Sequence, residues 1–373
     1  MNVLVFLTFG VSLKDWQDSG LLNREMRFYE ELHSKKKISF TFVTFGTEED
    51  LKYERNFTII PYYKYNKVLK SKFLTLFQSI MFSRKLISLV ETPDLIKTNQ
   101  LMGSWMAILC KYYLNRPLLI RTGYDIFRFS INDNKNLSKR IFYFILTQIT
   151  LFLSNTYIVT SISDKLFLEK FFLVSRNKIV INPNWTTSLP KITKEDIESR
   201  YDNRVIAVGR LENQKNFSSL IESFTNSDLQ IDIVGEGSQK NMLKNLAKDF
   251  NVNINFIGKL NHSDLMEKYK EYRVYISSSD YEGNSKSTLE ALGYGCLVVT
   301  KDIENNSEII SNNISGLLHT KNNLLNLVEN YISNIEEIYR ISVNAHLSVS
   351  KLNSLETIME KEYEQYLLLT RNN

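Results

Sequence analysis

Two glutamates that stand eight positions apart, Glu282 and Glu290, are the residues of this sequence best suited to bind a polar ligand. They lie in "YEGNSKSTLEALGYG" (281–295), which we expect to follow a buried strand, cross a glycine turn and open a helix at "TLEAL". A carboxylate before a glycine, as at Glu282, can accept hydrogen bonds from sugar hydroxyls because glycine lets a ligand approach the backbone. Ser287 and Glu290 also have the spacing of a capping box, so Glu290 has a structural alternative that Glu282 lacks.

The turn between these glutamates carries groups that favour anions. It contains Gly283, Asn284, Ser285 and Lys286. The backbone amides of residues 284 to 287 would face a phosphate at the start of the expected helix, and Lys286 adds a positive charge. We therefore expect this turn to contact a phosphorylated ligand.

A second candidate site follows the expected strand "RVIAVG", where Gly209 and Arg210 open a loop that ends at Lys215. Asn216 can cap the helix that begins after it. Two cations beside a helix N-terminus suit a diphosphate, because the charges, the free amides and the macrodipole all favour anions. The equally weighted alternative is a solvated loop with two surface cations.

Other residues that could do chemistry give weaker signals. Gly235 and Gly237 in "IDIVGEG" lack the third glycine of a dinucleotide fingerprint, so we expect a tight strand-to-helix turn there. The four histidines (His33, His262, His319 and His346) lie outside site-like contexts, and we expect them at the surface. The Asp-x-Asp triplet typical of metal-dependent sugar transfer is missing from the sequence, and we expect no metal.

The elements that must position these residues alternate between strands and helices. Expected strands are "NVLVFL", "ISFTFVTF", "DLIKT", "PLLIRT", "TYIVT" and "KIVI" in the first half, and "RVIAVG", "QIDIVG", "INFIG", "RVYISS" and "CLVVT" in the second. Such alternation predicts an α/β protein with parallel sheets that are doubly wound by helices. A chain of 373 residues suits two such Rossmann-like domains, with ligand bound in a cleft at the carboxyl ends of the strands.

The domain boundaries follow from a break in the apolar rhythm. The polar stretch with two prolines, "NPNWTTSLPKITKEDIESRYDN", predicts a linker over 186–202 between domains at 1–185 and 203–350. Apolar residues at three- and four-residue spacing in "SLETIMEKEYEQYLLL" predict a C-terminal helix over 351–373, which we expect to return to the first domain.

Charge is divided unequally between the halves. Residues 1–185 carry 26 Lys and Arg against 15 Asp and Glu, whereas the remainder carries 20 against 26. The first half is therefore expected to meet something anionic, such as a membrane, a phosphorylated acceptor or nucleic acid.

The two cysteines, Cys110 and Cys296, lie in apolar runs and are expected to be buried, in a protein of the reducing cytoplasm. The apolar opening "MNVLVFLTFG" is expected to be a first strand, and we do not expect secretion.

Two segments of the first half could meet a membrane. "IFYFILTQITLFL" (141–153) predicts a core helix in preference to an interfacial membrane helix. "PYYKYNKVLKSKFLTLF" (61–77) interleaves basic and aromatic residues, which fits a nucleic-acid surface, a membrane-facing loop and helix, or a solvated basic face.

Taken together, the Arg210–Lys215 loop, the "GEG" turn, "INFIGKL" and the glutamates Glu282 and Glu290 resemble the family-4 retaining glycosyltransferases of GT-B architecture. The wording "EGNSKSTLEALGYG" is similar to an "EGNPK-LLEA" variant of bacterial cell-surface polysaccharide enzymes. The resemblance is specific over 205–308. In the first half it is carried by "DSGLLNRE" and "RTGYDIFRF".

The resemblance implies a role for each matching residue. Arg210 and Lys215 would bind the donor diphosphate, Glu282 the transferred sugar and Glu290 the ribose. Gly209, Lys259, Leu260 and residues 283–286 would complete the donor site, with Lys259 and Leu260 near the base. On the first domain, Gly20 would face the donor, and Arg121, Tyr124 and Asp125 the acceptor. Ser285 replaces a proline of the similar enzymes, which loosens the turn but keeps its amides. Gly20 is single where many relatives have a glycine pair, so phosphate contacts from the first domain are not implied as strongly.

The implied reaction moves a sugar from a nucleoside-diphosphate sugar, used as a substrate without a further cofactor, to a hydroxyl of a lipid-linked glycan. The resemblance implies retention of anomeric configuration, no metal, and a place on the inner face of the plasma membrane, so we favour the membrane over nucleic acid as the anionic partner. The alternatives are a nucleotide-sugar epimerase or hydrolase of similar fold, and a degenerate non-catalytic sugar-nucleotide-binding subunit.

Overall fold

The computed structural model describes residues 1–187, 189–320 and 322–371. The chain forms two compact units. Unit 1 comprises Met1–Asn182 and the C-terminal segment from Met359, and unit 2 comprises Pro183–Ile358. Each unit is described by itself below.

Unit 1 is built on a parallel sheet that, within the described residues, has seven strands in the order β3-β2-β1-β4-β5-β6-β7. The strands are β1 (Asn2–Phe6), β2 (Ser39–Thr44), β3 (Thr58–Pro61), β4 (Leu95–Thr98), β5 (Leu118–Arg121), β6 (Thr156–Val159) and β7 (Ile179–Ile181). Six of them match the expected strands. The edge strand β3 was missed, because it has four residues, ends in proline and lacks a visible apolar alternation.

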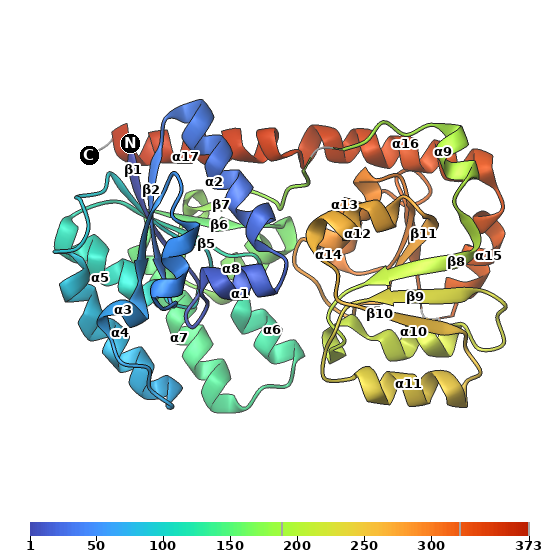
Figure 1. Cartoon of the computed structure of the whole chain (residues 1–373), viewed down its shortest axis with the longest axis horizontal. Coiled ribbons are helices and arrows are strands. Elements are labelled where there is room, and N and C mark those ends of the chain that lie inside the picture. The colour runs from blue at the N-terminus through green and yellow to red at the C-terminus, as the bar shows by residue number, and fades with distance from the viewer. Residues whose placement is uncertain (188, 321, 372–373) are drawn as a thin grey trace. The chain divides into compact units, whose positions relative to one another are not determined.

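Helices cover both faces of this sheet. They are α1 (Leu13–Asp18), α2 (Leu22–Lys36), α3 (Tyr62–Tyr65), α4 (Lys72–Leu86), α5 (Ser104–Leu114), α6 (Ile126–Asn132), α7 (Leu137–Leu153), α8 (Ile162–Phe171) and α17 (Leu355–Arg371), with short 3₁₀ turns at Glu48–Tyr53 and Arg176–Lys178. Figure 1 shows α2 and α17 along one face and α4, α5 and α7 on the other. The C-terminal helix thus returns to the first unit, as predicted.

Unit 2 has a second parallel sheet of six strands among its described residues, in the order β10-β9-β8-β11-β12-β13. The strands are β8 (Tyr201–Val208), β9 (Gln230–Val234), β10 (Ile254–Gly258), β11 (Tyr272–Ser277), β12 (Leu297–Lys301) and β13 (Leu317–His319). Only β13, three residues at the sheet edge, was not predicted. The prediction of two doubly wound parallel sheets is confirmed.

The helices of unit 2 enclose its sheet. They are α9 (Lys194–Glu198), α10 (Phe217–Ser223), α11 (Lys240–Asp249), α12 (His262–Tyr269), α13 (Lys286–Gly293), α14 (Glu304–Ser307), α15 (Leu324–Ile332) and α16 (Ile335–Leu352), with a 3₁₀ turn at Asn213–Lys215. Buried residues of β8, β9, β11 and β12 pack against α10, α11, α15 and α16 in one cluster, and against α12, α13 and α16 in another. Figure 1 shows α10 and α11 on one side of the sheet and α12 and α13 on the other. The same packing buries Cys296, and Cys110 is buried in unit 1, as predicted.

The division between the units falls at Asn182 and Pro183. The segment 186–202, expected as a linker, lies with unit 2, where Ile192 and Ile197 join its core. Ser188 in that segment, Lys321 in the expected second domain, and Asn372 and Asn373 in the expected final helix lie outside the described residues.

The prediction that 141–153 forms a core helix is confirmed for one side of the helix only. These residues belong to α7, and Ile141, Ile145, Ile149 and Phe152 are exposed. The helix packs through a narrow strip that includes Leu146, Thr147 and Leu151. Helical spacing shows that an apolar stripe exists but cannot show what covers it. Of the helices in the described parts of the chain, none has the length and apolarity needed to cross a bilayer.

A buried ion cluster ties α17 to the sheet of unit 1. Glu362 of α17 is fully buried, pairs with Lys97 of β4 and lies 3.4 Å from the guanidinium of Arg121 on β5. Tyr366 donates a 2.6 Å hydrogen bond to the same carboxylate. Burial raises the pKa of Glu362, but the charges of Lys97 and Arg121 outweigh it and hold that pKa below its usual value. The helix is therefore anchored by charge as well as by apolar packing.

We predict that Glu362→Gln destabilises the protein by about 3–5 kcal/mol, because it leaves Lys97 and Arg121 buried without a counter-charge. The control is Glu360→Gln on the same helix, which removes a half-exposed pair with Lys36 and should cost less than about 1 kcal/mol. Urea unfolding of the three proteins measures the difference. Equal midpoints for the two variants would contradict the anchoring role.

Candidate active site

The basic loop of unit 2, residues 209–216, leaves the carboxyl end of β8. Arg210 is exposed, and its Nη2 donates to Oε1 of Gln214 at 3.5 Å. A Cβ on Gly209 would lie 3.0 Å from Cε of Lys215, so the glycine lets the lysine chain lie flat against the end of the strand. A Cβ on Gly235 would lie 1.9 Å from the carbonyl oxygen of Gly209, so only glycine at 235 leaves room for this loop.

Lys215 and Glu282 form an ion pair at the centre of the site. The side chains of Lys215 and Glu282 are 15% and 7% exposed. Nε2 of Gln214 donates to Oε2 of Glu282 at 3.4 Å and to the carbonyl of Tyr281 at 3.0 Å. The expectation that Glu282, unlike Glu290, lacks a structural alternative is therefore wrong. The structure brings two of the predicted site residues into direct contact, although 67 positions separate them.

Hydrogen bonds to backbone carbonyls hold the basic loop against the loop after β11. Oγ of Ser278 donates to the carbonyls of Lys215 at 3.0 Å and Asn216 at 2.9 Å. The amide of Asp280 donates to the carbonyl of Gln214 at 3.0 Å. These bonds fix the relative positions of the cations and Glu282, so the site is organised by its loops as well as by the ion pair.

The predicted capping box of Ser287 and Glu290 is wrong. Helix α13 starts two residues earlier than the box requires, with Ser285 as the N-cap, and Oγ of Ser285 accepts from the amide of Thr288 at 3.4 Å. Ser287 instead accepts a 3.1 Å hydrogen bond from the hydroxyl of Tyr275 on β11. Glu290 is thus released from capping.

Glu290 is buried in the second turn of α13 and faces His262 at the start of α12. Nε2 of His262 lies 3.2 Å from Oε1 of Glu290, and the two side chains are 18% and 5% exposed. Lys259 and Leu260 lie three and two residues before this histidine; Lys259 is exposed, and Leu260 packs against the core. The loop expected to lie near a base is therefore brought close to the carboxylate expected to bind ribose.

Other members of the predicted turn have structural partners. Asn284 joins Asn184 twice: its Oδ1 accepts from the amide of Asn184 at 2.9 Å, and its carbonyl accepts from Nδ2 at 2.6 Å. The ammonium of Lys286 lies 5.7 Å from the ring centre of Trp185, within cation–π range. The turn is therefore fixed before any ligand binds.

The expectation that the histidines lie at the surface is wrong. His319 is buried and contacts the carbonyl of Ser277, and burial lowers its pKa. His33, His262 and His346 are half-buried. His262 and Gln214 are the site residues that sequence reasoning missed. Their partners are 28 and 68 positions away, and only the position of Gln214 next to Lys215 could have pointed to it.

The residues of unit 1 that were predicted to meet the donor or the acceptor lie in two places. Gly20 lies between α1 and α2, and the other three lie at or after the end of β5. Gly20 has φ +71° and ends the turn between α1 and α2. Arg121 is buried, and its guanidinium donates to the carbonyl of Asn182 at 3.3 Å as well as contacting Glu362. Tyr124 is exposed and packs on Phe129 with ring centres 4.5 Å apart. Of the three acceptor-side candidates, Tyr124 alone presents a large exposed surface.

Asp125 is buried at the N-cap of α6. Its Oδ1 accepts from the amide of Arg128 at 2.6 Å. Burial, with a smaller contribution from nearby Asp164, raises the pKa of Asp125 to about 7, against the opposing hydrogen bond from the amide of Arg128. The carboxyl group therefore changes charge near neutral pH.

We predict that Asp125 makes the protein less stable as pH rises from about 4 to about 7, because the folded state keeps a proton that the unfolded state releases. Asp125→Asn keeps an oxygen for the cap and should remove this part of the pH dependence, which makes the variant more stable than the parent above about pH 7. Asp133→Asn, at the exposed end of the same helix, is the control. Thermal unfolding across this pH range would contradict the prediction if Asp125→Asn and the parent followed the same curve.

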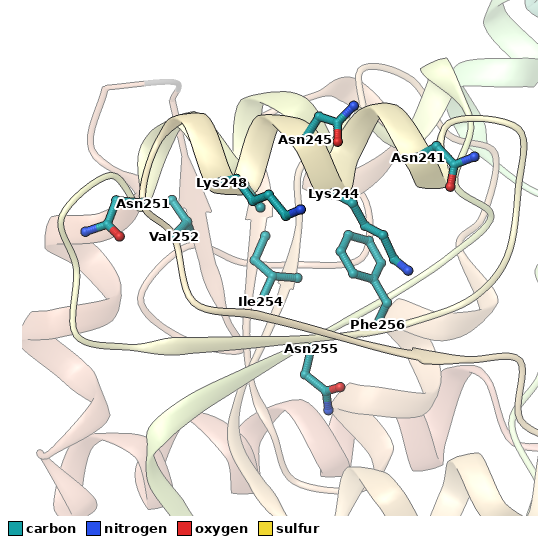
Figure 2. Close-up of a pocket in the computed structure, with 10 residues that line it drawn as sticks. Asn241, Lys244, Asn245, Lys248, Asn251, Val252, Ile254, Asn255 and Phe256 are labelled. Atoms are coloured by element: carbon teal, nitrogen blue, oxygen red, sulfur yellow. The ribbon is translucent and has the colours of Figure 1, made fainter.

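A separate pocket of unit 2 lies between α11 and β10. Figure 2 shows Lys244 and Lys248 of α11 above Ile254 and Phe256. Its ten lining residues, between Asn241 and Phe256, include none of the predicted site residues. The ion pair of Lys215 and Glu282, and not this pocket, therefore marks the candidate active site.

Comparison with known families points to the same unit. Residues 191–342 match the family described as "Glycosyl transferases group 1". This segment includes both cations and both glutamates of the candidate site. Unit 2 thus carries the sequence pattern of group 1 glycosyltransferases.

Two curated relatives show how far the similarity extends. The UDP-N-acetylglucosamine–peptide N-acetylglucosaminyltransferase GtfA subunit of Streptococcus agalactiae is 30% identical over 137 residues, which is 35% of this chain and 27% of the relative. The amylovoran biosynthesis glycosyltransferase AmsD of Erwinia amylovora is 30% identical over 156 residues, which is 40% of this chain and 44% of the relative. The chain therefore spans less than half the length of these relatives.

A solved structure shows the fold over the whole chain. Anabaena Alr3699/HepE in complex with UDP-glucose is similar with a TM-score of 0.75 at 15% identity, and the match covers 99% of this chain and 100% of that protein. The two doubly wound parallel sheets of this chain are those of the GT-B architecture, which confirms the predicted fold class.

Proposed function

We propose that this protein is a retaining, metal-independent glycosyltransferase that moves a sugar from a nucleoside-diphosphate sugar to a hydroxyl of a lipid-linked glycan in bacterial surface polysaccharide synthesis. The observation that supports this most is the contact of Lys215 with Glu282, beside Arg210, in a segment that matches a glycosyltransferase family. A cation for phosphate and a carboxylate for sugar hydroxyls are what such a donor requires at adjacent positions.

The departure of the diphosphate from the sugar sets the main barrier to the proposed sugar transfer. Negative charge grows on the diphosphate as its bond to the sugar breaks, so cations and amides held near its oxygens lower the barrier. Arg210 is exposed after β8 and contacts Gln214, and Ser278 holds the backbone of Lys215 at the end of the same loop. We propose that these two cations bind the diphosphate and that the amides at the start of α13 add to them.

The ion pair gives donor binding a defined first step. Lys215 neutralises Glu282 in this structure. We propose that the diphosphate takes over Lys215, which leaves the Glu282 carboxylate free to accept hydrogen bonds from the sugar. Gln214 can hold Glu282 in place during this exchange, because it contacts both the carboxylate and the carbonyl of Tyr281.

Glu290 is proposed to bind the ribose hydroxyls. It lies in the second turn of α13, whose N-cap is Ser285, and Nε2 of His262 lies 3.2 Å from one of its oxygens. Lys259 and Leu260, three and two residues before His262, are proposed to lie beside the base. Ribose and base would then bind between α13 and the loop after β10.

One observation supports a glycan acceptor, and another supports an anionic surface. The relative AmsD is named for amylovoran biosynthesis. The positive charge of the first half is concentrated in residues 62–178, with 18 Lys and Arg against 6 Asp and Glu. We propose a lipid-linked glycan as the acceptor and a peripheral position on the cytoplasmic face of the plasma membrane, with Tyr124 and Asp125 on the acceptor side.

One alternative has an observation in its favour. The Streptococcus agalactiae relative is named a subunit, which fits a chain that works with a partner enzyme. The retention of two cations and two carboxylates in a preorganised site supports catalysis by this chain. An epimerase or hydrolase would consume donor without acceptor, so measuring donor loss in the absence of acceptor separates that class.

We predict that Arg210→Ala slows sugar transfer by about ten- to a few hundred-fold, because a charged hydrogen bond to the leaving group is lost. The control is Arg204→Ala, in the strand β8 that precedes Arg210. It removes a half-buried arginine that stacks on Tyr201 and should change the rate little. The rates are compared at saturating donor. Full activity of Arg210→Ala would show that the diphosphate does not bind there.

We predict that Glu290→Gln lowers the affinity for uridine diphosphate by roughly tenfold, because a neutral amide binds ribose hydroxyls more weakly than a carboxylate. Glu267→Gln removes an exposed carboxylate of α12 that pairs with Lys270 and should leave the affinity unchanged. Isothermal titration calorimetry measures both. If the two variants bind alike, Glu290 does not contact the nucleotide.

The experiment that tests the proposed function as a whole is a thermal-shift screen with uridine, guanosine and adenosine diphosphate sugars. A donor at a hundred times its dissociation constant should stabilise the folded protein by about 2.7 kcal/mol. A shift with one base and its loss in Arg210→Ala are expected. The absence of a shift with every nucleotide sugar would overturn the proposal.

A further inference from the structure

An exposed apolar stripe runs along α7 of unit 1. Leu137, Ile141, Ile145 and Ile149 repeat every four residues, and their exposed fractions are 71%, 49%, 50% and 42%. Phe152 is 74% exposed and extends the stripe. This spacing places the side chains on one side of the helix. The helix contains no Asp or Glu, and Lys139 and Arg140 stand at its start.

Helix α4 carries a second stripe of the same kind. Phe73, Leu74, Phe77 and Met81 are 75%, 52%, 60% and 63% exposed. Helix α5 packs against both α4 and α7, and Figure 1 shows the three helices on one face of the sheet of unit 1. We call the two stripes together the α4–α7 face. Exposed apolar side chains on neighbouring helices mark an interaction surface, whereas scattered ones do not.

The charge around this face is positive. Lys67, Lys70 and Lys72 are exposed at the start of α4, and Arg84 and Lys85 are exposed near its end. Residues 1–61 carry 8 Lys and Arg against 9 Asp and Glu. The whole excess of positive charge in the first half therefore lies in the segment that contains the α4–α7 face. The occupant should therefore offer both apolar material and negative charge.

We propose that the α4–α7 face docks on an anionic lipid bilayer, with the two apolar stripes at the boundary between headgroups and acyl chains and the flanking lysines and arginines on the headgroups. Amphipathic helices with basic flanks bind membranes in this way. The inference names the surface for the membrane partner proposed above and rests on that proposal.

Two other occupants fit the face less well. A second copy of the chain would bring two basic surfaces together, which like-charge repulsion opposes. Nucleic acid would stack its bases on exposed aromatic rings among the cations. Phe73 and Phe77 of α4 are exposed beside lysines, but Tyr62 is fully buried, and Tyr63 and Tyr65 are half-buried. Aliphatic side chains, which offer no stacking platform, dominate the exposed stripe of α7, so the face as a whole fits a bilayer better.

The test is co-sedimentation of the full chain with vesicles of phosphatidylglycerol and phosphatidylcholine, compared with phosphatidylcholine alone. The parent should bind the anionic vesicles, and binding should weaken as salt is added. The double variant Ile141→Ser/Ile145→Ser should lower the partition coefficient by roughly tenfold or more, because two apolar side chains no longer enter the bilayer. Leu368→Ser is the matched control, since Leu368 is an exposed leucine of α17 on the other face of the sheet.

Each outcome decides the inference. Equal vesicle binding by the parent and the double variant would overturn it, as would binding that does not depend on lipid charge. If sedimentation velocity showed a dimer that the double variant disrupts, the face would be covered by a second copy of the chain. If a labelled oligonucleotide bound and the vesicles did not, the face would bind nucleic acid. The nucleotide-sugar thermal shift, measured on the same proteins, reports the donor site separately. A normal shift without vesicle binding refutes the membrane face alone, and vesicle binding without any shift refutes the proposed function alone.

Discussion

The ion pair between Lys215 and Glu282 is the constraint on which the candidate site depends. A buried pair of opposite charges is tolerated only when hydrogen bonds support it, because desolvation of both groups is costly. Gln214 supplies that support to Glu282, while Ser278 holds the backbone of the lysine loop. The pair therefore fixes the distance between the end of β8 and the turn that leads into α13. Every role proposed for Arg210, Glu282 and the amides of α13 requires this distance.

The sequence predicts the fold well where apolar periodicity extends over several residues. Most strands and the C-terminal helix are recovered because their alternation or three- and four-residue spacing is visible locally. The strands β3 and β13 are missed because three or four residues at a sheet edge carry too little pattern. The burial of α7 is predicted correctly for one side only, because spacing identifies an apolar stripe but not the partner that covers it.

The candidate site is predicted less evenly. Its cations and carboxylates are recognisable from residue type, position after strands and family resemblance. Their connections are not, because Lys215 and Glu282, or His262 and Glu290, meet only through the order of strands in the sheet. The capping prediction fails for a related reason: Tyr275, on a neighbouring strand, takes Ser287 as a hydrogen-bond acceptor, and the local spacing of Ser287 and Glu290 cannot reveal this. In unit 1, Arg121 takes part in anchoring α17 through Glu362, a contact 241 positions away in sequence.

The most direct test of the central claim is a double-mutant cycle on the affinity for uridine diphosphate, with Lys215→Met and Glu282→Gln made singly and together. If the diphosphate takes Lys215 from Glu282, Lys215→Met weakens binding, Glu282→Gln leaves it unchanged or strengthens it, and the double variant binds like Lys215→Met alone. The contradicting result is a loss of affinity in both single variants that adds in the double variant. That result would mean that Glu282 does not compete with the diphosphate for Lys215.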